Sequence, residues 1–226
     1  MATPRPQARP IDRIQQNLLA VSERRLLTWL CSKTPAAIMP DHLTILGIFG
    51  AVMIFAGYTA SLTADGWLWL AIAGYFVQWL GDSLDGSLAR FRKIERPSYG
   101  YFIDHSCDGI ATLLILGGMG LSPYVRLDIA LFALIGYLLM SIHVFLSARV
   151  LSEVRLSYVA FGPTELRFVL IGLTLIMMFG GDKARHVSAI NGFDIAVGIA
   201  GALLVGLFVF QTLYTGRRLA RMERRG

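Results

Sequence analysis

Residues Gly81 to Gly109 read GDSLDGSLARFRKIERPSYGYFIDHSCDG, and they join two apolar segments through a basic loop, Phe91–Tyr99. The loop is short enough for the two segments to return antiparallel to each other. The stretch holds four aspartates at helical spacing: Asp82 and Asp85, followed by Asp104 and Asp108. Residues three or four apart share one face of a helix, so the stretch predicts a helical hairpin on which two acidic faces converge.

The four carboxylates predict a metal site. Carboxylates that face one another repel, and a bare carboxylate near a bilayer is costly, so a cation has to neutralise them. Oxygen ligands without Cys-x-x-Cys or paired histidines favour Mg²⁺, Mn²⁺ or Ca²⁺ over zinc or copper. Such a set can hold two ions about 3.5–4 Å apart, the spacing used in phosphoryl displacement. The alternative is that the acids cap helices or pair with Arg90, Arg92 and Lys93, but four acids on two adjoining membrane helices favour the metal site.

Small residues flank the acids. Gly86 follows the second aspartate directly, and Ala89 lies on the same side of that predicted helix. Gly100 starts the turn before the second acidic pair. A missing side chain lets the backbone approach a phosphate or a base closely. Each small residue is also compatible with plain helix packing, but their joint placement among the acids favours a nucleotide cleft.

Outside this stretch the chain is rich in apolar segments. It is 55% hydrophobic and 16% charged, with a mean hydropathy of +0.58, whereas soluble domains carry about a quarter charged residues. A spanning helix needs about 20 apolar residues. Six segments approach that length: Leu43–Leu62, Trp67–Leu84, Phe102–Leu121, Ile129–Leu146, Leu166–Phe179 and Ile195–Tyr214. The fifth is short as an apolar run and needs residues from its flanks to cross. We therefore expect an all-α, multi-pass membrane protein with six transmembrane helices.

The positive charges give the orientation of these helices. With six crossings both termini lie on one side, and three of the 21 Lys and Arg residues fall on the other: Arg126, Lys183 and Arg185. Positive charge collects on the cytoplasmic side of membranes, which predicts cytoplasmic termini and a cytoplasmic active site. The net charge of +6 therefore suits an anionic membrane surface better than nucleic acid.

The chain divides into three parts. We expect a polar, basic cytoplasmic arm in residues 1–40, the catalytic six-helix domain in residues 41–216 and a basic cytoplasmic tail in residues 217–226. Within the arm, Ile11–Leu30 interleaves apolar and charged residues, which predicts an amphipathic helix on the cytoplasmic surface. The alternative is a basic arm that sets the topology and does nothing more.

Small residues also recur on the last helix. Gly198, Ala202 and Gly206 are four residues apart, a spacing that lets two membrane helices pack closely. The stripe is compatible with a dimer contact or with packing inside the monomer. We expect the second, because membrane helices are rich in glycine in general.

The acidic stretch resembles the signature of the CDP-alcohol phosphotransferases. The pattern is Asp-x-x-Asp-Gly-x-x-Ala-Arg, a spacer, and then Gly-x-x-x-Asp-x-x-x-Asp. Every signature position is present here: Asp82, Asp85, Gly86, Ala89, Arg90, Gly100, Asp104 and Asp108. The segment Met39–Thr44 is also similar to the family's Pro-Asn-x-x-Thr start of the first membrane helix, with Asp41 in place of Asn. The six-helix layout extends the resemblance over most of the chain.

The resemblance implies a metal-dependent transferase of phospholipid biosynthesis. In it the four aspartates bind two Mg²⁺ or Mn²⁺ ions, which hold the pyrophosphate of a CDP-linked donor. Cytidine lies against Gly86, Ala89 and Gly100, and Arg90 neighbours the nucleotide. Asp108 acts as a general base toward the acceptor hydroxyl, and CMP leaves. Members of this family are often homodimers, and we expect one here.

The resemblance leaves two directions of transfer open. A chain of about 200 residues with six helices is similar to bacterial members that transfer a phosphatidyl group from CDP-diacylglycerol to a small polar alcohol such as inositol phosphate or glycerol phosphate. We expect this direction, in a bacterial inner membrane. The alternative is transfer from CDP-choline or CDP-ethanolamine to diacylglycerol, because Asp104-His105-x-Cys107-Asp108 resembles the Asp-His-Gly-Cys-Asp of the eukaryotic enzymes. A membrane transporter and a non-catalytic homologue are rival classes, and the intact signature argues against both.

A second basic site is predicted before the fifth apolar segment. Arg155 and Arg167 flank Phe161-Gly-Pro-Thr-Glu-Leu, and Glu165 and Arg167 resemble the Glu/Arg stretch that lines the acceptor pocket of inositol-phosphate-using members. The same residues, with Pro163 followed by Thr164, also make a plain helix start. His105 either modifies the properties of the acidic site or simply packs against neighbouring side chains, and we expect packing.

Overall fold

The computed structural model describes residues 20–151, 163–180 and 190–223. Within these ranges the chain forms seven α-helices and one 3₁₀ helix, and no strand. The elements are α1 (Ala20–Lys33), α2 (Pro40–Ala60), η1 (Asp65–Trp67), α3 (Leu68–Arg92), α4 (Pro97–Gly120), α5 (Leu127–Leu151), α6 (Pro163–Phe179) and α7 (Gly192–Glu223). The predicted all-α class is therefore confirmed.

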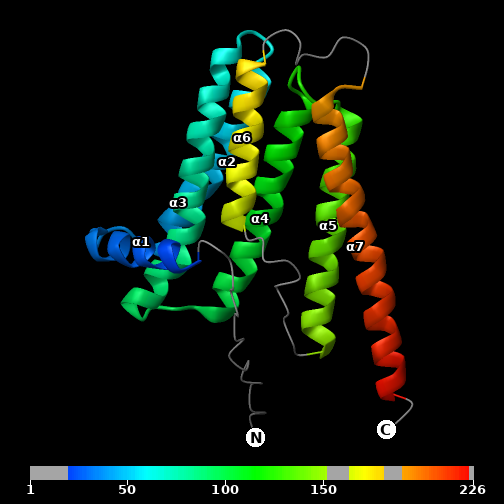
Figure 1. Ribbon diagram of the computed structural model, residues 1–226. Helices are drawn as coiled ribbons and strands as arrows, with labels where there is room; N and C mark the ends of the chain where they lie inside the picture. The colour runs from blue at the N-terminus through cyan, green and yellow to red at the C-terminus, as the bar shows by residue number, and fades with distance from the viewer. Residues whose placement is uncertain (1–19, 152–162, 181–189, 224–226) are drawn as a thin grey trace, which may run out of the picture.

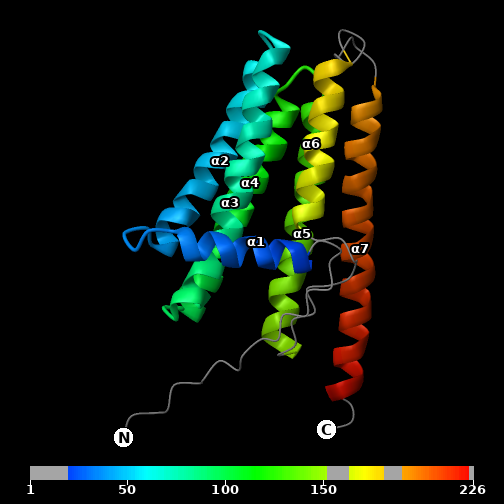
Figure 2. The same cartoon turned by 60° about the vertical axis from the view of Figure 1, so that its left-hand side comes forward.

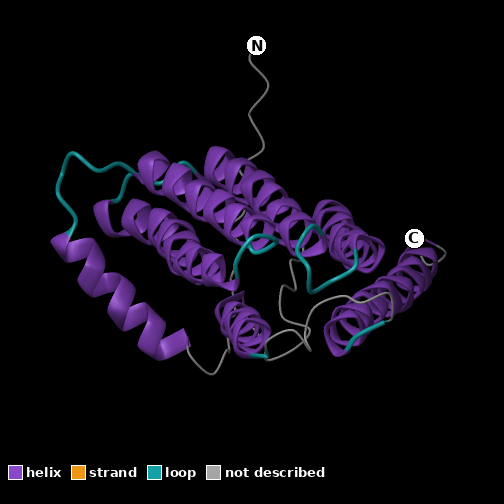
Figure 3. Cartoon of the chain, turned by 90° about the horizontal axis from the view of Figure 1, so that it is seen from above, coloured by secondary structure: helices purple, strands orange, loops and turns teal. Residues whose placement is uncertain are grey.

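Helices α2 to α7 run alongside one another, and α1 lies across one end of this bundle (Figures 1 and 2). Seen from above, α7, the last helix of the described chain, lies at one side of the bundle (Figure 3). The most extensive helix contact joins α2 to α3, and the next joins α5 to α7. Helix α4 connects these two pairs, because it packs on both α2 and α5.

Among the described residues, three helices are long and apolar enough to cross a membrane: α2, α5 over Leu127–Val150, and α7. They coincide with three of the predicted segments, as expected for a membrane protein. The remaining predicted segments fall on α3, α4 and α6. Helices α3 and α4 carry the acidic pairs near one end, and α6 has only 17 residues.

Glycines bring α2 and α3 unusually close together. A Cβ atom at Gly50 would lie 2.3 Å from the backbone nitrogen of Gln78, and one at Gly81 would lie 2.3 Å from the backbone nitrogen of Gly47. No side chain fits at such distances, so glycine is required at both positions. Gly81 directly precedes Asp82, and this close contact therefore fixes the acidic end of α3 against the start of α2.

Helix α1 covers the second half of the predicted amphipathic segment; the first half lies outside the described residues. Leu27 and Cys31 of α1 pack in a cluster with Leu43, Leu84 and Leu88. Trp29 faces away from this cluster and is 57% exposed. Burial raises the pKa of the Cys31 thiol, which suits a small packing residue.

Arg92, at the end of α3, holds the turn between α1 and α2. Its guanidinium donates hydrogen bonds to the carbonyl oxygens of Thr34 (3.0 Å), Pro35 (2.8 Å) and Ile38 (2.6 Å). The planar fork of arginine suits several acceptors at once. Arg92 therefore ties the N-terminal helix to the hairpin that carries the acids.

The prediction that the Gly198, Ala202 and Gly206 stripe packs inside the monomer is wrong. Within the described part of the chain, a Cβ atom at Gly206 would meet no atom within 4 Å, and one at Gly198 would approach Ile129 alone, at 3.7 Å. The close contact of α7 with α5 is made instead at Gly201, where a Cβ atom would lie 2.9 Å from Cα of Ala133. The face of α7 that packs on α5 is therefore offset by one residue from the predicted stripe, because the position of α5 decides which face of α7 it contacts.

Candidate active site

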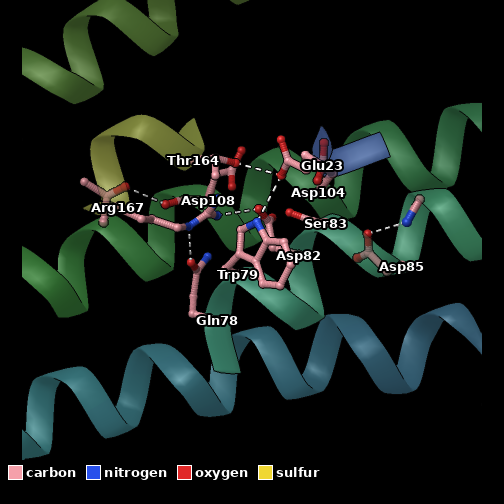
Figure 4. Close-up of polar contacts among 12 residues, drawn as sticks. Glu23, Gln78, Trp79, Asp82, Ser83, Asp85, Asp104, Asp108, Thr164 and Arg167 are labelled. Atoms are coloured by element: carbon pink, nitrogen blue, oxygen red, sulfur yellow. Dashed lines mark hydrogen bonds and ion pairs between the residues drawn. The ribbon is translucent and has the colours of Figure 1, made fainter. Parts of the chain in front are cut away.

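The four predicted aspartates line a single pocket, and their side chains lie near Glu23 of α1 (Figure 4). Helix α3 supplies Asp82 and Asp85, and α4 supplies Asp104 and Asp108, as the helical spacing predicted. The rest of the lining comes from α2, α3 and α4: Thr44, Gly47, Ile48, Gln78, Cys107 and Ala111. The predicted hairpin with converging acidic faces is therefore what the chain forms.

Asp82 contacts a positively charged side chain that comes from α6. Arg167 Nη2 donates to Asp82 Oδ2 at 2.5 Å, and Arg167 Nε donates to Gln78 Oε1 at 2.7 Å (Figure 4). The Arg167 side chain is 13% exposed and that of Asp82 is 25% exposed. Charged groups this deeply placed need partners, and the forked guanidinium here binds two neighbouring residues of α3. Arg167, predicted as a site residue, thus lies beside the acids.

Asp85 is fixed by neutral donors. Thr44 Oγ1 of α2 donates to its Oδ2 at 2.6 Å, and the backbone N–H of Gly86 lies 2.5 Å from its Oδ1. The carboxylate is therefore oriented before any ligand arrives. Thr44 occupies the final position of the Pro-Asn-x-x-Thr-like segment, which gives that resemblance a physical meaning. Asp41, in the Asn position, forms an ion pair with Arg96 instead.

His105 lies beside the acids of α4. Its Nδ1 is 3.6 Å from Asp104 Oδ2 and 3.7 Å from Asp108 Oδ2. Its ring packs on those of Tyr101 (centroids 4.3 Å apart) and Phe145 (5.2 Å). The two predicted roles of His105, packing and contact with the acidic site, are therefore compatible: the ring packs on aromatic side chains while Nδ1 faces the carboxylates.

The donor set fits a divalent metal ion. Ligand atoms of Asp104, His105 and Asp108 all lie within 4.8 Å of one another, and Asp82 and Asp85 line the same pocket. Like charges at this density repel unless a cation binds between them. Carboxylate oxygens are the ligands that Mg²⁺ and Mn²⁺ prefer.

The predicted nucleotide residues lie beyond the acids, on the same two helices. A Cβ atom at Gly100 would meet nothing within 4 Å, so packing within the described chain does not require glycine there. At Gly86 the nearest atom would be Arg90 Nη1, at 3.4 Å. Arg90 itself donates to Ser87 Oγ at 3.3 Å. None of these residues, nor Ala89, lines the acidic pocket, and the predicted Arg155 lies outside the described residues.

Gln78 belongs to the site and was missed from the sequence. It is 5% exposed, lines the acidic pocket and accepts a hydrogen bond from Arg167. A signal was present, because Gln78 is a polar residue in an apolar run, one helical turn before Asp82. A polar side chain on the acidic face of a membrane helix is expected to serve the site.

Comparison with known proteins gives one family and several relatives. A family model described as CDP-alcohol phosphatidyltransferase matches residues 37–212. Cholinephosphotransferase 1 from Danio rerio is 29% identical over 96 residues, which cover 40% of this chain and 25% of that protein. The Xenopus laevis protein of the same name is 29% identical over 134 residues, covering 53% and 33%. The Homo sapiens protein is 31% identical over 101 residues, covering 42% and 25%. The matched stretch thus spans about a quarter to a third of these relatives.

Proposed function

The chain belongs to the CDP-alcohol phosphatidyltransferase family, and we propose that it transfers a phospho-alcohol group from a CDP-activated donor to a hydroxyl acceptor, with release of CMP. The observation that carries this proposal is the single pocket lined by Asp82, Asp85, Asp104 and Asp108. A hydroxyl attacks phosphorus poorly unless its proton is removed and the charge on the phosphates is neutralised. The pocket offers groups for both tasks.

We propose that the four aspartates hold two Mg²⁺ or Mn²⁺ ions. Such ions, when bound, neutralise the donor's pyrophosphate and the departing CMP. Thr44 and the Gly86 amide orient Asp85 as a ligand, and Arg167 orients Asp82. These contacts are of the kind that fixes ligands around a metal site.

We propose Asp108 as the group that accepts the proton of the attacking hydroxyl. Its side chain is 39% exposed, so an acceptor can reach it from outside the bundle. Asp108→Asn keeps the shape but removes the basic oxygen. Turnover near the wild-type rate in a variant that still binds metal would refute this assignment.

The acceptor and nucleotide sites are proposals as well. Arg167 is 13% exposed and contacts Asp82, which lines the pocket, so we propose that it meets an anionic group of a substrate, with Arg155 as its proposed companion. Arg167→Ala should raise the acceptor's KM, and an unchanged KM would leave Arg167 with a structural role. Cytidine is proposed to lie against Gly86, Ala89 and Gly100 with Arg90 beside it, and the open space next to Gly100 supports this.

A second observation supports a proposal for the direction of transfer. His105 and Cys107 complete an Asp-His-x-Cys-Asp motif in which His105 faces both acids, and the relatives above are named cholinephosphotransferases. Both favour a small CDP-linked amino alcohol as donor and diacylglycerol as acceptor. Transfer from CDP-diacylglycerol to a small polar alcohol, the direction expected from chain length, is the second candidate, and Arg167 supports it if that alcohol is anionic.

We further propose six membrane crossings by α2 to α7, with both termini and the active site in the cytoplasm of a bacterial cell, and a homodimeric assembly. The distribution of Lys and Arg supports this orientation. Helix α1 is proposed to lie on the cytoplasmic surface, because it crosses the end of the bundle (Figure 2) and exposes Trp29 beside Arg24 and Arg25. A membrane-impermeant thiol reagent should label a cysteine placed at 217 only from the cytoplasmic side.

The deciding assay is CMP release by the purified protein in detergent with Mg²⁺ or Mn²⁺. One mixture holds CDP-choline or CDP-ethanolamine with diacylglycerol, and the other holds CDP-diacylglycerol with pooled polar alcohols. Release in the first mixture that is lost in Asp104→Asn supports the first direction. Release only in the second mixture reverses the direction, and no CMP in either with folded, metal-loaded protein would overturn the proposed reaction.

A further inference from the structure

Glu23 of α1 joins two helices of the active site from outside the family-matched region, which begins at residue 37. Its Oε1 accepts a hydrogen bond from Trp79 Nε1 of α3 at 3.0 Å and another from Thr164 Oγ1 of α6 at 2.7 Å (Figure 4). The three residues are part-buried. One carboxylate oxygen therefore links three helices that are distant in sequence.

The partners of Glu23 lie one helical turn from a second contact between the same helices. Trp79 precedes Asp82 by three residues, and Thr164 precedes Arg167 by three. Arg167 reaches back to Gln78 and Asp82. Helices α3 and α6 are thus joined at this end by two successive polar links, the first through Glu23 and the second through Arg167.

Resting on the proposed function, we propose that Glu23 is a positioning residue for the reaction: it fixes the first turn of α6 so that Arg167 meets Asp82 in the metal- and phosphate-binding pocket. Arginine has a long side chain, and its two-pronged contact with Gln78 and Asp82 holds only if the helix backbone stays in place. The main helix contact of α6 within the described chain is with α3, so a hydrogen-bonded link at the first turn of α6 should affect how α6 lies against α3. A displacement of about 1 Å can cost roughly a hundred-fold in rate even when the altered residue does not touch the substrate.

The chemistry of the link predicts which substitution is tolerated. Both donors are neutral, so they need an acceptor oxygen and not a negative charge. Glu23→Gln keeps that oxygen, whereas Glu23→Ala removes it. Ser22→Ala is the matched control, because Ser22 is an exposed neighbour on the same helix.

The experiment measures CMP release in the full-length protein together with amide hydrogen exchange at residues 167–170, the first amides of α6 that have partners within the helix. We expect Glu23→Ala to lower kcat/KM roughly ten- to a hundred-fold and to speed exchange at these amides. Glu23→Gln and Ser22→Ala should stay near the wild type in both measurements. Thr164→Val, which removes one donor, should show a smaller loss of the same kind.

A double-variant cycle separates positioning from general support of the fold. If Glu23 acts through Arg167, then Glu23→Ala adds no further loss of kcat/KM in the Arg167→Ala protein. Full additivity, an unchanged exchange rate in Glu23→Ala, or a Gln variant as impaired as the Ala variant would each overturn the inference. A wild-type protein that releases no CMP would refute the proposed function, while the exchange data would still decide whether Glu23 holds α6.

Discussion

The two ends of the bundle use aspartate in opposite ways. At the end away from α1, Asp194 is 1% exposed, and its oxygens accept hydrogen bonds from the backbone N–H groups of Arg126 (2.8 Å) and Asn191 (3.0 Å). At the other end, four aspartates from two helices share one pocket. Asp194 is enclosed by backbone donors of its own chain. Asp82 and Asp85 also accept hydrogen bonds, but they share their pocket with two further carboxylates, and such like charges repel one another and create a demand for a cation. That contrast supports the proposal that the acids sharing a pocket act on a ligand.

The largest effect that tests the contrast is expected from Asp104→Asn. Removing one charged group from a preorganised site should lower CMP release by about a hundred- to a thousand-fold. In EDTA the same change should leave the melting temperature unchanged or raised, because it removes a like charge from the cluster. Activity and thermal unfolding are measured on the same preparation, with and without Mg²⁺.

Asp194→Asn is the matched control at the opposite end. It should lower the free energy of unfolding by about 1–3 kcal/mol, because it weakens a buried acceptor of two backbone donors. CMP release per folded molecule should stay near the wild-type value. If instead Asp194→Asn abolished activity, or Asp104→Asn lowered stability as much, the division between structural and site acids would be wrong.

The next effect contrasts a glycine of the site end with one of α7. Gly81→Ala places a methyl group against the backbone of Gly47 and should separate α2 from α3, at a cost of about 1–3 kcal/mol. Activity should fall with it, because Thr44 of α2 then loses its contact with Asp85 of α3. In Gly206→Ala the added methyl group meets no atom of the described residues within 4 Å, and alanine is the better helix former, so neither stability nor activity should fall. Equal melting temperatures for the two variants would contradict the close α2–α3 contact.

Short-range sequence patterns predicted the acidic cluster of the candidate site. Spacing of three and four residues placed Asp82, Asp85, Asp104 and Asp108 on two helix faces, and the short loop brought those faces together. The contacts of Glu23 with Thr164, 141 residues apart, and of Arg167 with Gln78, 89 residues apart, were not predictable in this way. They depend on which helices become neighbours, and periodicity within one helix carries no information about that.

The error on α7 has the same origin. A repeat of small residues shows that a helix can pack closely, but the partner decides which face does so. Here α5 packs closely on α7 where Ala133 meets Gly201, and not at Gly198 or Ala202. Local sequence thus predicts the elements and the acidic faces, and the tertiary contacts settle the remaining choices.

A smaller effect distinguishes two arginines at the site end. Arg92→Lys removes the fork that holds the turn between α1 and α2, and should lower the free energy of unfolding by about 1–2 kcal/mol. Its effect on kcat/KM should be far smaller than that of Arg167→Lys, because Arg92 contacts backbone carbonyls and Arg167 contacts Asp82. Thermal unfolding and CMP release of both variants make the comparison. A larger loss of kcat/KM for Arg92→Lys than for Arg167→Lys would indicate that the turn between α1 and α2 matters more for the reaction than the contact of α6 with Asp82.

The smallest effect is expected from Arg126→Ala at the opposite end. The Arg126 side chain forms an ion pair with Asp128 at 2.7 Å, and both groups are largely exposed, so the loss of stability should be the smallest of the set and should shrink further in high salt. The backbone N–H of Arg126, which binds Asp194, survives the substitution. Arg126→Ala therefore separates an exposed ion pair from the buried acceptor beside it. If thermal unfolding showed a loss as large as that of Asp194→Asn, the stability of this end would depend on its surface charges and not on the enclosed carboxylate.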